Sequence, residues 1–164
     1  MSGVFGRSLP PAAHLEVGDA APSFARPLVN ADYWEDVSID DLLSEPTLLL
    51  FYPMDGTGMA SYAWIEIRER GIDPDRLLGL SISTPYEHQA FIHDHRLPYR
   101  LYSDPGNDVA EAFGVVHDHH GMSISGARPS AFLLEPDRTI RWAWVAEEWP
   151  AMPPYDDLEA ALSG

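Results

Sequence analysis

The middle of the chain alternates between continuous apolar runs and segments with helical spacing. Residues 47–52 (TLLLFY) and 77–83 (LLGLSIS) are apolar runs typical of strands that are buried on both faces. Residues 59–70 follow the first run without Gly or Pro and place apolar side chains on one helical side. Residues 85–95 follow the second run, with Pro85 in the first turn. This order predicts two consecutive strand-loop-helix units.

The sequence on either side of these units predicts shorter elements. Before them we expect an extended lead-in over residues 1–16, a hairpin of strands 23–28 and 33–37, and one helical turn at 38–43. After them we expect a strand at 99–102, a helix at 108–113, a polar loop at 115–127, strands at 131–134 and 139–145, and a helix at 155–162. The whole predicts an α/β protein with one domain over residues 1–164, in which helices flank a mixed central sheet. This order of elements is that of the thioredoxin fold.

The charged residues are strongly unbalanced. All ten basic residues are Arg, against 26 Asp and Glu, which gives a formal net charge of -16. Because 45 % of the residues are hydrophobic and only 22 % are charged, this balance indicates an acidic surface rather than disorder. Nucleic acids and membrane surfaces are held mainly by Lys and Arg, so neither is an expected partner.

We expect the protein to be more stable in molar salt than in dilute buffer. Self-repulsion at this net charge is screened when the Debye length falls to about 3 Å at 1 M salt. Together with the absence of Lys, this favours a salt-rich cytoplasm. Thermal melting across a salt series tests the inference, and an unchanged melting temperature would contradict it. No segment resembles a signal peptide or a membrane span, so a cytoplasmic location is expected.

The chain contains no cysteine. Disulfides, cysteine-ligated zinc, iron–sulfur clusters and thiol nucleophiles are therefore all excluded. We expect no cofactor.

Several short motifs occur in a recognisable order. Residues 17–24 (VGDAAPSF) resemble V-G-D-x-A-P-x-F, and residues 51–57 (FYPMDGT) resemble F-Y-P-x-D-x-T. Similar blocks follow at residues 78–83, 103–105, 112–115 and 132–137. In this order they resemble the peroxiredoxin family, and within it the bacterioferritin-comigratory class of AhpC/TSA redoxins. The resemblance implies the thioredoxin fold with a peroxiredoxin-type N-terminal hairpin.

The resemblance also implies an active site, and this chain departs from it at the decisive position. In such enzymes a threonine, here Thr57, stands three residues before the peroxidatic cysteine, and a proline, here Pro53, precedes it in the same motif. Three residues after Thr57 the chain has Ala60. Only a thiolate attacks the peroxide oxygen, so thiol peroxidase activity is not expected.

The arginine that the family uses to hold the thiolate is displaced as well. The family places it three residues before the phenylalanine matched by Phe132, where this chain has Pro129. Arg128 lies one residue too early, and on an extended backbone that shift turns its side chain to the opposite face. Pro129 instead resembles the cis-proline that precedes the equivalent strand in thioredoxin-like disulfide reductases.

Histidines are the other candidates for chemistry. His117, His119 and His120 fall in the predicted loop at 115–127 and could hold a metal near Thr57. Their irregular spacing favours solvated histidines in a polar loop instead, so we expect no metal site. His88 and His95 are seven residues apart and could share a helix face. Trp142 and Trp144 share one face of a predicted strand, which favours core packing or a dimer contact.

These observations lead to two hypotheses. The first is a non-catalytic peroxiredoxin-like protein with a binding or regulatory role, whose partner is a redox protein or a second copy of itself. Its vestigial active site would comprise Pro53, Thr57, Ala60, Arg128 and Pro129. The alternative is an antioxidant oxidoreductase that uses metal bound by the histidine-rich segment instead of a thiol.

Overall fold

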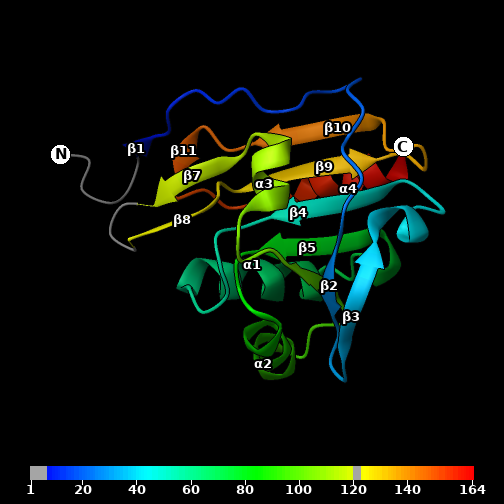
Figure 1. Ribbon diagram of the computed structural model, residues 1–164, viewed down its shortest axis with the longest axis vertical. Coiled ribbons are helices and arrows are strands. Elements are labelled where there is room, and N and C mark those ends of the chain that lie inside the picture. The colour runs from blue at the N-terminus through cyan, green and yellow to red at the C-terminus, as the bar shows by residue number, and fades with distance from the viewer. Residues whose placement is uncertain (1–6, 120–122) are drawn as a thin grey trace.

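The computed structural model describes residues 7–119 and 123–164, and a seven-stranded mixed sheet forms its centre (Figure 1). The strand order is β10-β9-β4-β5-β6-β2-β3. These strands are β2 (Ala25–Val29), β3 (Trp34–Ser38), β4 (Thr47–Phe51), β5 (Leu77–Ser81), β6 (Arg100–Ser103), β9 (Ser130–Leu134) and β10 (Ile140–Val145). β5 pairs in parallel with β4 and β6, and the other pairs are antiparallel. The two apolar runs of the sequence thus become adjacent strands in the middle of the sheet.

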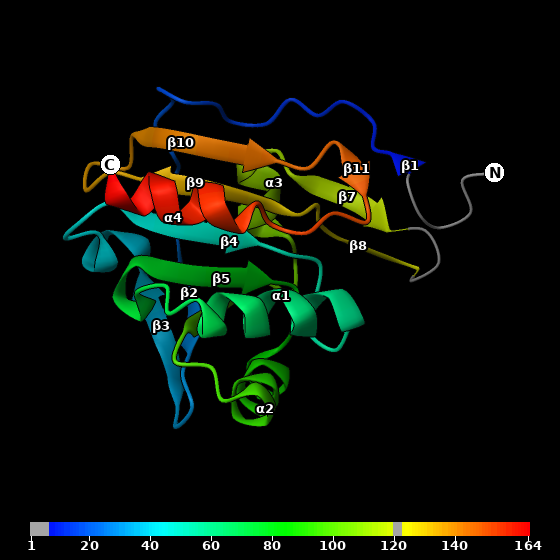
Figure 2. The ribbon, with the colours of Figure 1, turned by 180° about the vertical axis from the view of Figure 1, so that it is seen from behind.

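Helices cover both faces of this sheet (Figure 2). One face carries α1 (Gly58–Glu69), α2 (Pro85–His95) and α4 (Tyr155–Ser163), and the other carries α3 (Asp108–Phe113). Two 3-10 turns, η1 (Ile39–Leu42) and η2 (Pro74–Arg76), precede β4 and β5. The predicted architecture, an α/β protein with a mixed sheet between helices, is confirmed.

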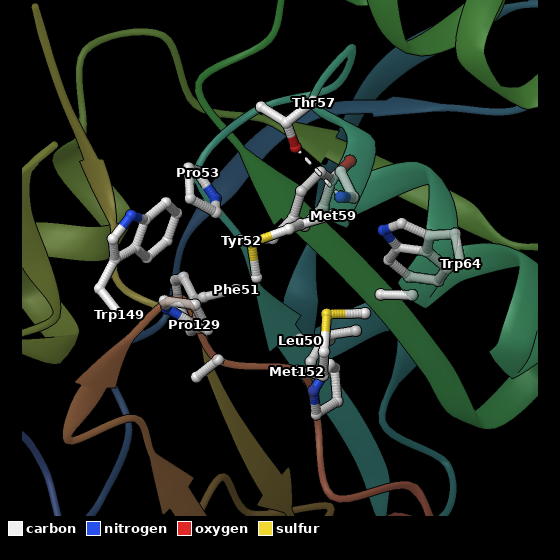
Figure 3. A pocket seen from close by; sticks show the side chains of 14 residues that line it. Leu50, Phe51, Tyr52, Pro53, Thr57, Met59, Trp64, Pro129, Trp149 and Met152 are labelled. Carbon is white, nitrogen blue, oxygen red and sulfur yellow. Dashed lines mark hydrogen bonds between the residues drawn. The ribbon is translucent and has the colours of Figure 1, made fainter. Parts of the chain in front are cut away.

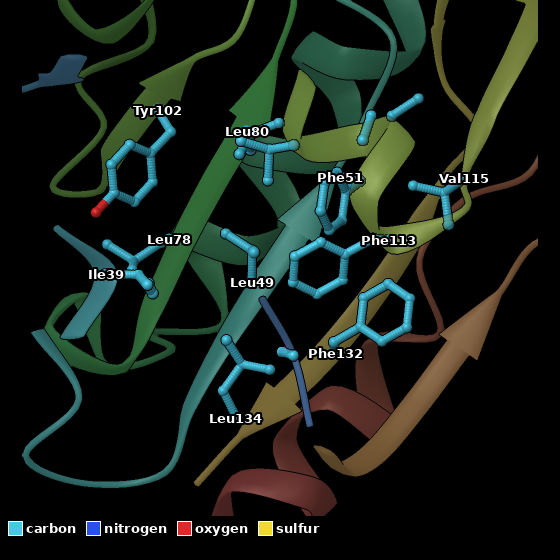
Figure 4. Packing of buried hydrophobic residues seen from close by; sticks show 14 of the residues in the cluster. Ile39, Leu49, Phe51, Leu78, Leu80, Tyr102, Phe113, Val115, Phe132 and Leu134 are labelled. Carbon is cyan, nitrogen blue, oxygen red and sulfur yellow. The ribbon is translucent and has the colours of Figure 1, made fainter. Parts of the chain in front are cut away.

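The side chains of β4 alternate between two hydrophobic cores. Leu49 and Phe51 pack with α3, where the Phe51 and Phe113 rings lie 5.0 Å apart (Figure 4). Leu48 and Leu50 pack on the opposite face against α1 and its neighbours, including Trp64. Because successive residues of a strand point to opposite faces, a fully apolar run is what a doubly covered strand requires. Trp142 and Trp144 of β10 also pack against this second core.

Gly79 in β5 allows Trp64 to lie directly on the sheet. A Cβ atom at residue 79 would stand 2.5 Å from Cζ2 of Trp64 and 2.6 Å from Cδ2 of Leu101. We expect Gly79→Ala to destabilise the protein by about 1–3 kcal/mol, as overpacked cores do. Urea unfolding measures the loss. A Gly58→Ala variant is the control, since a Cβ there meets no atom within 4 Å. Equal stability of the Gly79 variant and the original protein would contradict this packing.

The segment predicted as a polar loop at residues 115–127 is instead a hairpin. β7 (Val116–His119) pairs antiparallel with β8 (Ile124–Ala127), in the register Val116 to Ala127 and His119 to Ile124. The loop prediction was wrong because each strand has only four residues and most of them are polar or small. Their sequences therefore lack the alternation of apolar and polar residues that identifies a strand. His120 lies outside the described residues.

The N-terminal lead-in lies along the edge of the sheet. β1 (Arg7–Ser8) pairs with β11 (Glu148–Trp149), and the backbone N–H of Leu9 donates to Glu147 O at 2.8 Å. Further along, the Gly18 N–H donates to Ile140 O at 2.8 Å. The lead-in therefore follows β10 from one end to the other (Figures 1 and 2). Short pairings across 140 residues of sequence leave no local signal, so sequence reasoning missed both strands.

Candidate functional site

The first turn of α1 forms the base of the candidate site. β4 ends at Phe51, and Pro53 then interrupts the extended run before the chain turns into α1. Thr57 is the N-cap of this helix, and its Oγ1 accepts a hydrogen bond of 3.0 Å from the Ala60 backbone N–H. Threonine is favoured here because its hydroxyl satisfies one of the helix N–H groups that has no partner within the helix. The cap places Ala60 beside Thr57 at the end of a central strand.

An apolar recess opens above this turn (Figure 3). Its empty volume is about 420 Å³, counting the part that is open to solvent. One wall comes from β4 and α1, and the other comes from Pro129 and the segment that leads into α4. The fourteen lining residues are Leu50, Phe51, Tyr52, Pro53, Thr57, Met59, Ala60, Ala63, Trp64, Pro129, Trp149, Ala151, Met152 and Pro153. Four residues predicted from the sequence, Pro53, Thr57, Ala60 and Pro129, thus line one recess.

The recess contains little that could take part in acid, base or nucleophilic chemistry. Ala60 contributes a buried methyl group. Tyr52 is the titratable side chain among the lining residues, and its hydroxyl donates to Asp55 Oδ1 at 2.6 Å. Burial first, and then the nearby Asp55 charge, raise the pKa of Tyr52 well above its ordinary value. The phenol therefore stays protonated and serves as a structural donor.

A buried network behind the recess holds this tyrosine in place. His88 Nδ1 lies 2.7 Å from Asp55 Oδ2, and His88 Nε2 lies 2.9 Å from Tyr102 O. The Asp55 backbone N–H donates to Ser83 Oγ at 2.8 Å. Carbonyl and carboxylate oxygens accept hydrogen bonds, so both ring nitrogens of His88 face acceptors. His88 therefore links Asp55, in the loop before α1, to the backbone of Tyr102 in β6.

His88 and His95, which are seven residues apart on α2, have different hydrogen-bond partners. His88 is fully buried in the network with Asp55, whereas His95 Nε2 lies 3.1 Å from Ser61 Oγ at the other end of α2. Sequence reasoning missed the pairing of His88 with Asp55. The signal available was a histidine in the first turn of a helix that packs behind the F-Y-P-x-D motif.

His119 of the β7–β8 hairpin packs inside the protein. His119 is buried, its Nε2 donates to Ala127 O at 3.2 Å, and its ring lies 4.7 Å from the Trp149 ring. Burial first, and then His117, lower the pKa of His119 to about 4. Within residues 7–119 and 123–164, no three His, Asp or Glu side chains are grouped so that they could hold a metal ion. His119 thus packs the hairpin against Trp149, one wall of the recess.

Arg128 does not line the recess, although Pro129 does. Its Nη1 donates to Ala146 O at 3.2 Å and its Nη2 donates to Pro10 O at 2.7 Å, which places the guanidinium under the N-terminal lead-in. The two consecutive residues that precede β9 therefore face different sites.

The resemblance of Pro129 to a cis-proline is wrong for this chain. The cis peptide bond in the described part of the chain joins Trp149 to Pro150, so the bond that precedes Pro129 is trans.

None of the helices in the described ranges is both long and apolar enough to cross a membrane.

Comparisons with known proteins agree with this geometry. The model of the AhpC/TSA family matches residues 17–143. A protein of Coxiella burnetii that carries the name peroxiredoxin bcp is 33% identical over 139 residues, which cover 79% of this chain and 88% of that protein. Peroxiredoxin Bcp of Bacillus subtilis is 27% identical over 154 residues, covering 90% of this chain and 93% of that protein.

Solved structures show the same fold. The crystal structure of Enterococcus faecalis AhpC has a TM-score of 0.77 to this chain at 18% sequence identity, and each chain is covered to 90%. At this identity the likeness concerns the fold, which is the thioredoxin fold predicted from the sequence. The family match covers most of the chain and includes the recess-lining motif at residues 51–57. The chain therefore belongs to the AhpC/TSA family of peroxiredoxin-like proteins, as a member whose sequence contains no cysteine.

Proposed function

We propose that this protein is a non-catalytic member of its family that binds an apolar group of a partner in the recess above Ala60. One observation carries the proposal: Ala60 supplies a methyl group at the position where related enzymes have the peroxidatic cysteine, in a chain without any cysteine. Peroxide reduction by this family requires a thiolate that attacks the peroxide oxygen. A methyl group cannot form or stabilise that nucleophile.

The electrostatic setting of the recess supports the same proposal. Holding an anionic nucleophile requires a nearby cation or several aimed N–H groups. The guanidinium of Arg128 donates to Ala146 O and Pro10 O, outside the recess. The Ala60 N–H is engaged by Thr57 Oγ1. The described residues that line the recess include no cationic side chain, so any charge stabilisation at residue 60 comes from the backbone N–H groups of the first turn of α1.

The lining of the recess favours an apolar occupant. Met59 and Met152 are half-buried in its lining, and Trp149 adds an aromatic ring to it (Figure 3). Methionine side chains are flexible and polarizable, so such a surface adapts to an aliphatic or aromatic group. We infer that the occupant is a side chain of a second copy of this chain or of a partner redox protein. The acidic, lysine-free composition supports a cytoplasmic role at high salt.

Binding of Nile red, a neutral apolar dye, tests the recess. We expect its fluorescence to rise on addition of the protein and to be weaker with Ala151→Glu, which puts a charge at the lining. Ala160→Glu is the matched control, since Ala160 is exposed on α4. Equal dye binding by the protein and both variants would place the dye elsewhere and contradict the proposed binding role.

A cysteine introduced at residue 60 tests whether the first turn of α1 can still activate a thiol. We expect Ala60→Cys to react with hydrogen peroxide about tenfold faster than Tyr62→Cys at pH 7, because N–H groups at a helix N-terminus lower the pKa of a thiol there by roughly one unit. Tyr62 lies on the same helix but is 65% exposed, so the thiol of Tyr62→Cys is the matched control. Loss of free thiol over time gives both rates. A rate for Ala60→Cys no higher than that for Tyr62→Cys would show that the first turn no longer activates this position.

A further inference from the structure

The guanidinium of Arg128 is buried with few hydrogen-bond partners. Only 5% of the surface of Arg128 is exposed to solvent. Of its five N–H groups, one on Nη1 donates to Ala146 O at 3.2 Å and one on Nη2 donates to Pro10 O at 2.7 Å. Its Nε is buried and has no hydrogen-bond partner. The side chain therefore uses less than half of its donors, and both acceptors are neutral backbone carbonyls.

No carboxylate neutralises this cation. The ion pairs in the described ranges engage Arg26, Arg68, Arg70, Arg138 and Arg141, but not Arg128. Residues 1–6 and 120–122, the rest of the chain, contain neither Asp nor Glu. Burial lowers the pKa of Arg128, yet an arginine stays protonated in proteins. A chain with a net charge of -16 thus keeps one buried guanidinium without a counter-ion.

Space for a counter-ion exists beside this group. Arg128 forms part of the wall of two recesses under the lead-in segment 10–12, with empty volumes of about 780 and 830 Å³ including the parts open to solvent. The first is also lined by Ser8 and His14, and the second by His117 and Asp118. Each has one exposed acid at its wall, Glu147 in the first and Asp118 in the second. The first recess adds the Ser8 hydroxyl as a neutral donor, so it is the better site for an anion.

We propose that Arg128 binds a small oxyanion, a carboxylate or a phosphate, in the recess between the lead-in and the end of β10. A guanidinium matches the two oxygens of such a group with two parallel N–H donors. An isolated buried charge is costly, and an anion that pairs with it removes this cost. The bound anion would also strengthen the attachment of the lead-in, because Nη2 of Arg128 already holds Pro10 O. This site is separate from the recess above Ala60, so the proposal does not depend on the proposed function.

Calorimetric titration at constant ionic strength tests the site, with sodium acetate and inorganic phosphate as the probes and sodium chloride as the balancing salt. We expect saturable binding of one equivalent of at least one probe. Acetate alone would indicate a carboxylate ligand, and phosphate alone a phosphorylated one. Arg128→Met should raise the apparent dissociation constant about tenfold or more, since a charge-assisted hydrogen bond contributes at least about 1.4 kcal/mol. Arg141→Met, which removes an exposed arginine of β10, should bind like the original protein.

A second measurement covers the case in which Arg128→Met does not fold. The Nε–H resonances of the ten arginines are followed by nuclear magnetic resonance in the unmutated protein during the same titrations. We expect one resonance, assigned to Arg128 by its absence in Arg128→Lys, to shift and saturate with the bound probe. Neither probe giving a saturable signal, or an equal response from the Arg128 and Arg141 variants, would overturn the proposal.

Discussion

Replacing His88 by leucine is expected to destabilise the protein by about 3–5 kcal/mol, because two buried acceptors lose their donor and each such loss costs about 1–3 kcal/mol. His88 is fully buried, and its two ring nitrogens lie 2.7 Å from Asp55 Oδ2 and 2.9 Å from Tyr102 O. The variant leaves Asp55, which is 6% exposed, with one fewer donor and leaves the Tyr102 carbonyl without its side-chain partner. Urea unfolding monitored by tryptophan fluorescence measures the change in the free energy of unfolding.

The matched control for this variant lies on the same helix. His93 is exposed on α2, and its Nε2 donates to Ala31 O at 2.7 Å. His93→Leu should cost no more than about 1 kcal/mol, as for a surface hydrogen bond. If the two variants lose similar stability, the His88 and Asp55 pair is not the buried network described above.

Stability should also fall by about 3 kcal/mol between pH 7 and pH 4 because of His119, at 1.36 kcal/mol per unit of pKa difference. The pKa of His119 is lowered to about 4 in the folded protein, chiefly by burial, from an ordinary value of 6.5. Below pH 6.5 the unfolded chain therefore takes up a proton at this residue that the folded protein does not. The stabilisation is complete above pH 6.5 and is lost as the pH falls toward 4.

Urea unfolding at several pH values and constant salt isolates this effect. His119→Phe keeps a ring against Trp149 and removes the titrating group, so its stability should depend less on pH between 6.5 and 4 than that of the original protein. His93→Phe, at an exposed position, should keep the original pH dependence. Parallel curves for the original protein and His119→Phe would contradict the buried, neutral state of His119.

The strands and helices that could be predicted are those whose own residues show the apolar pattern or the capping residue of that element. The apolar run at residues 47–52 needs cover on both faces, and Thr57 followed by an uninterrupted segment predicts the start of α1. The position of Ala60 in the first helical turn follows from the same local pattern. These elements are decided within about a dozen residues, which is the range over which periodicity and capping act.

The features that sequence reasoning missed depend on contacts between distant segments. β1 and β11 pair across 140 residues, and the short polar strands β7 and β8 become recognisable only when they face each other. His88 and Asp55 are 33 residues apart, and nothing in either local pattern specifies the other. The displacement of Arg128 from the active-site face could be predicted because strand alternation is local, but its burial against Pro10 O could not.

Consumption of hydrogen peroxide decides whether this protein keeps the peroxiredoxin fold without thiol peroxidase activity. The purified, metal-free protein is mixed with peroxide and dithiothreitol, and peroxide is followed over time. We expect the same rate as with dithiothreitol alone, because the lining of the recess at Ala60 offers a methyl group and no thiolate. Consumption of many equivalents of peroxide per protein molecule would contradict it.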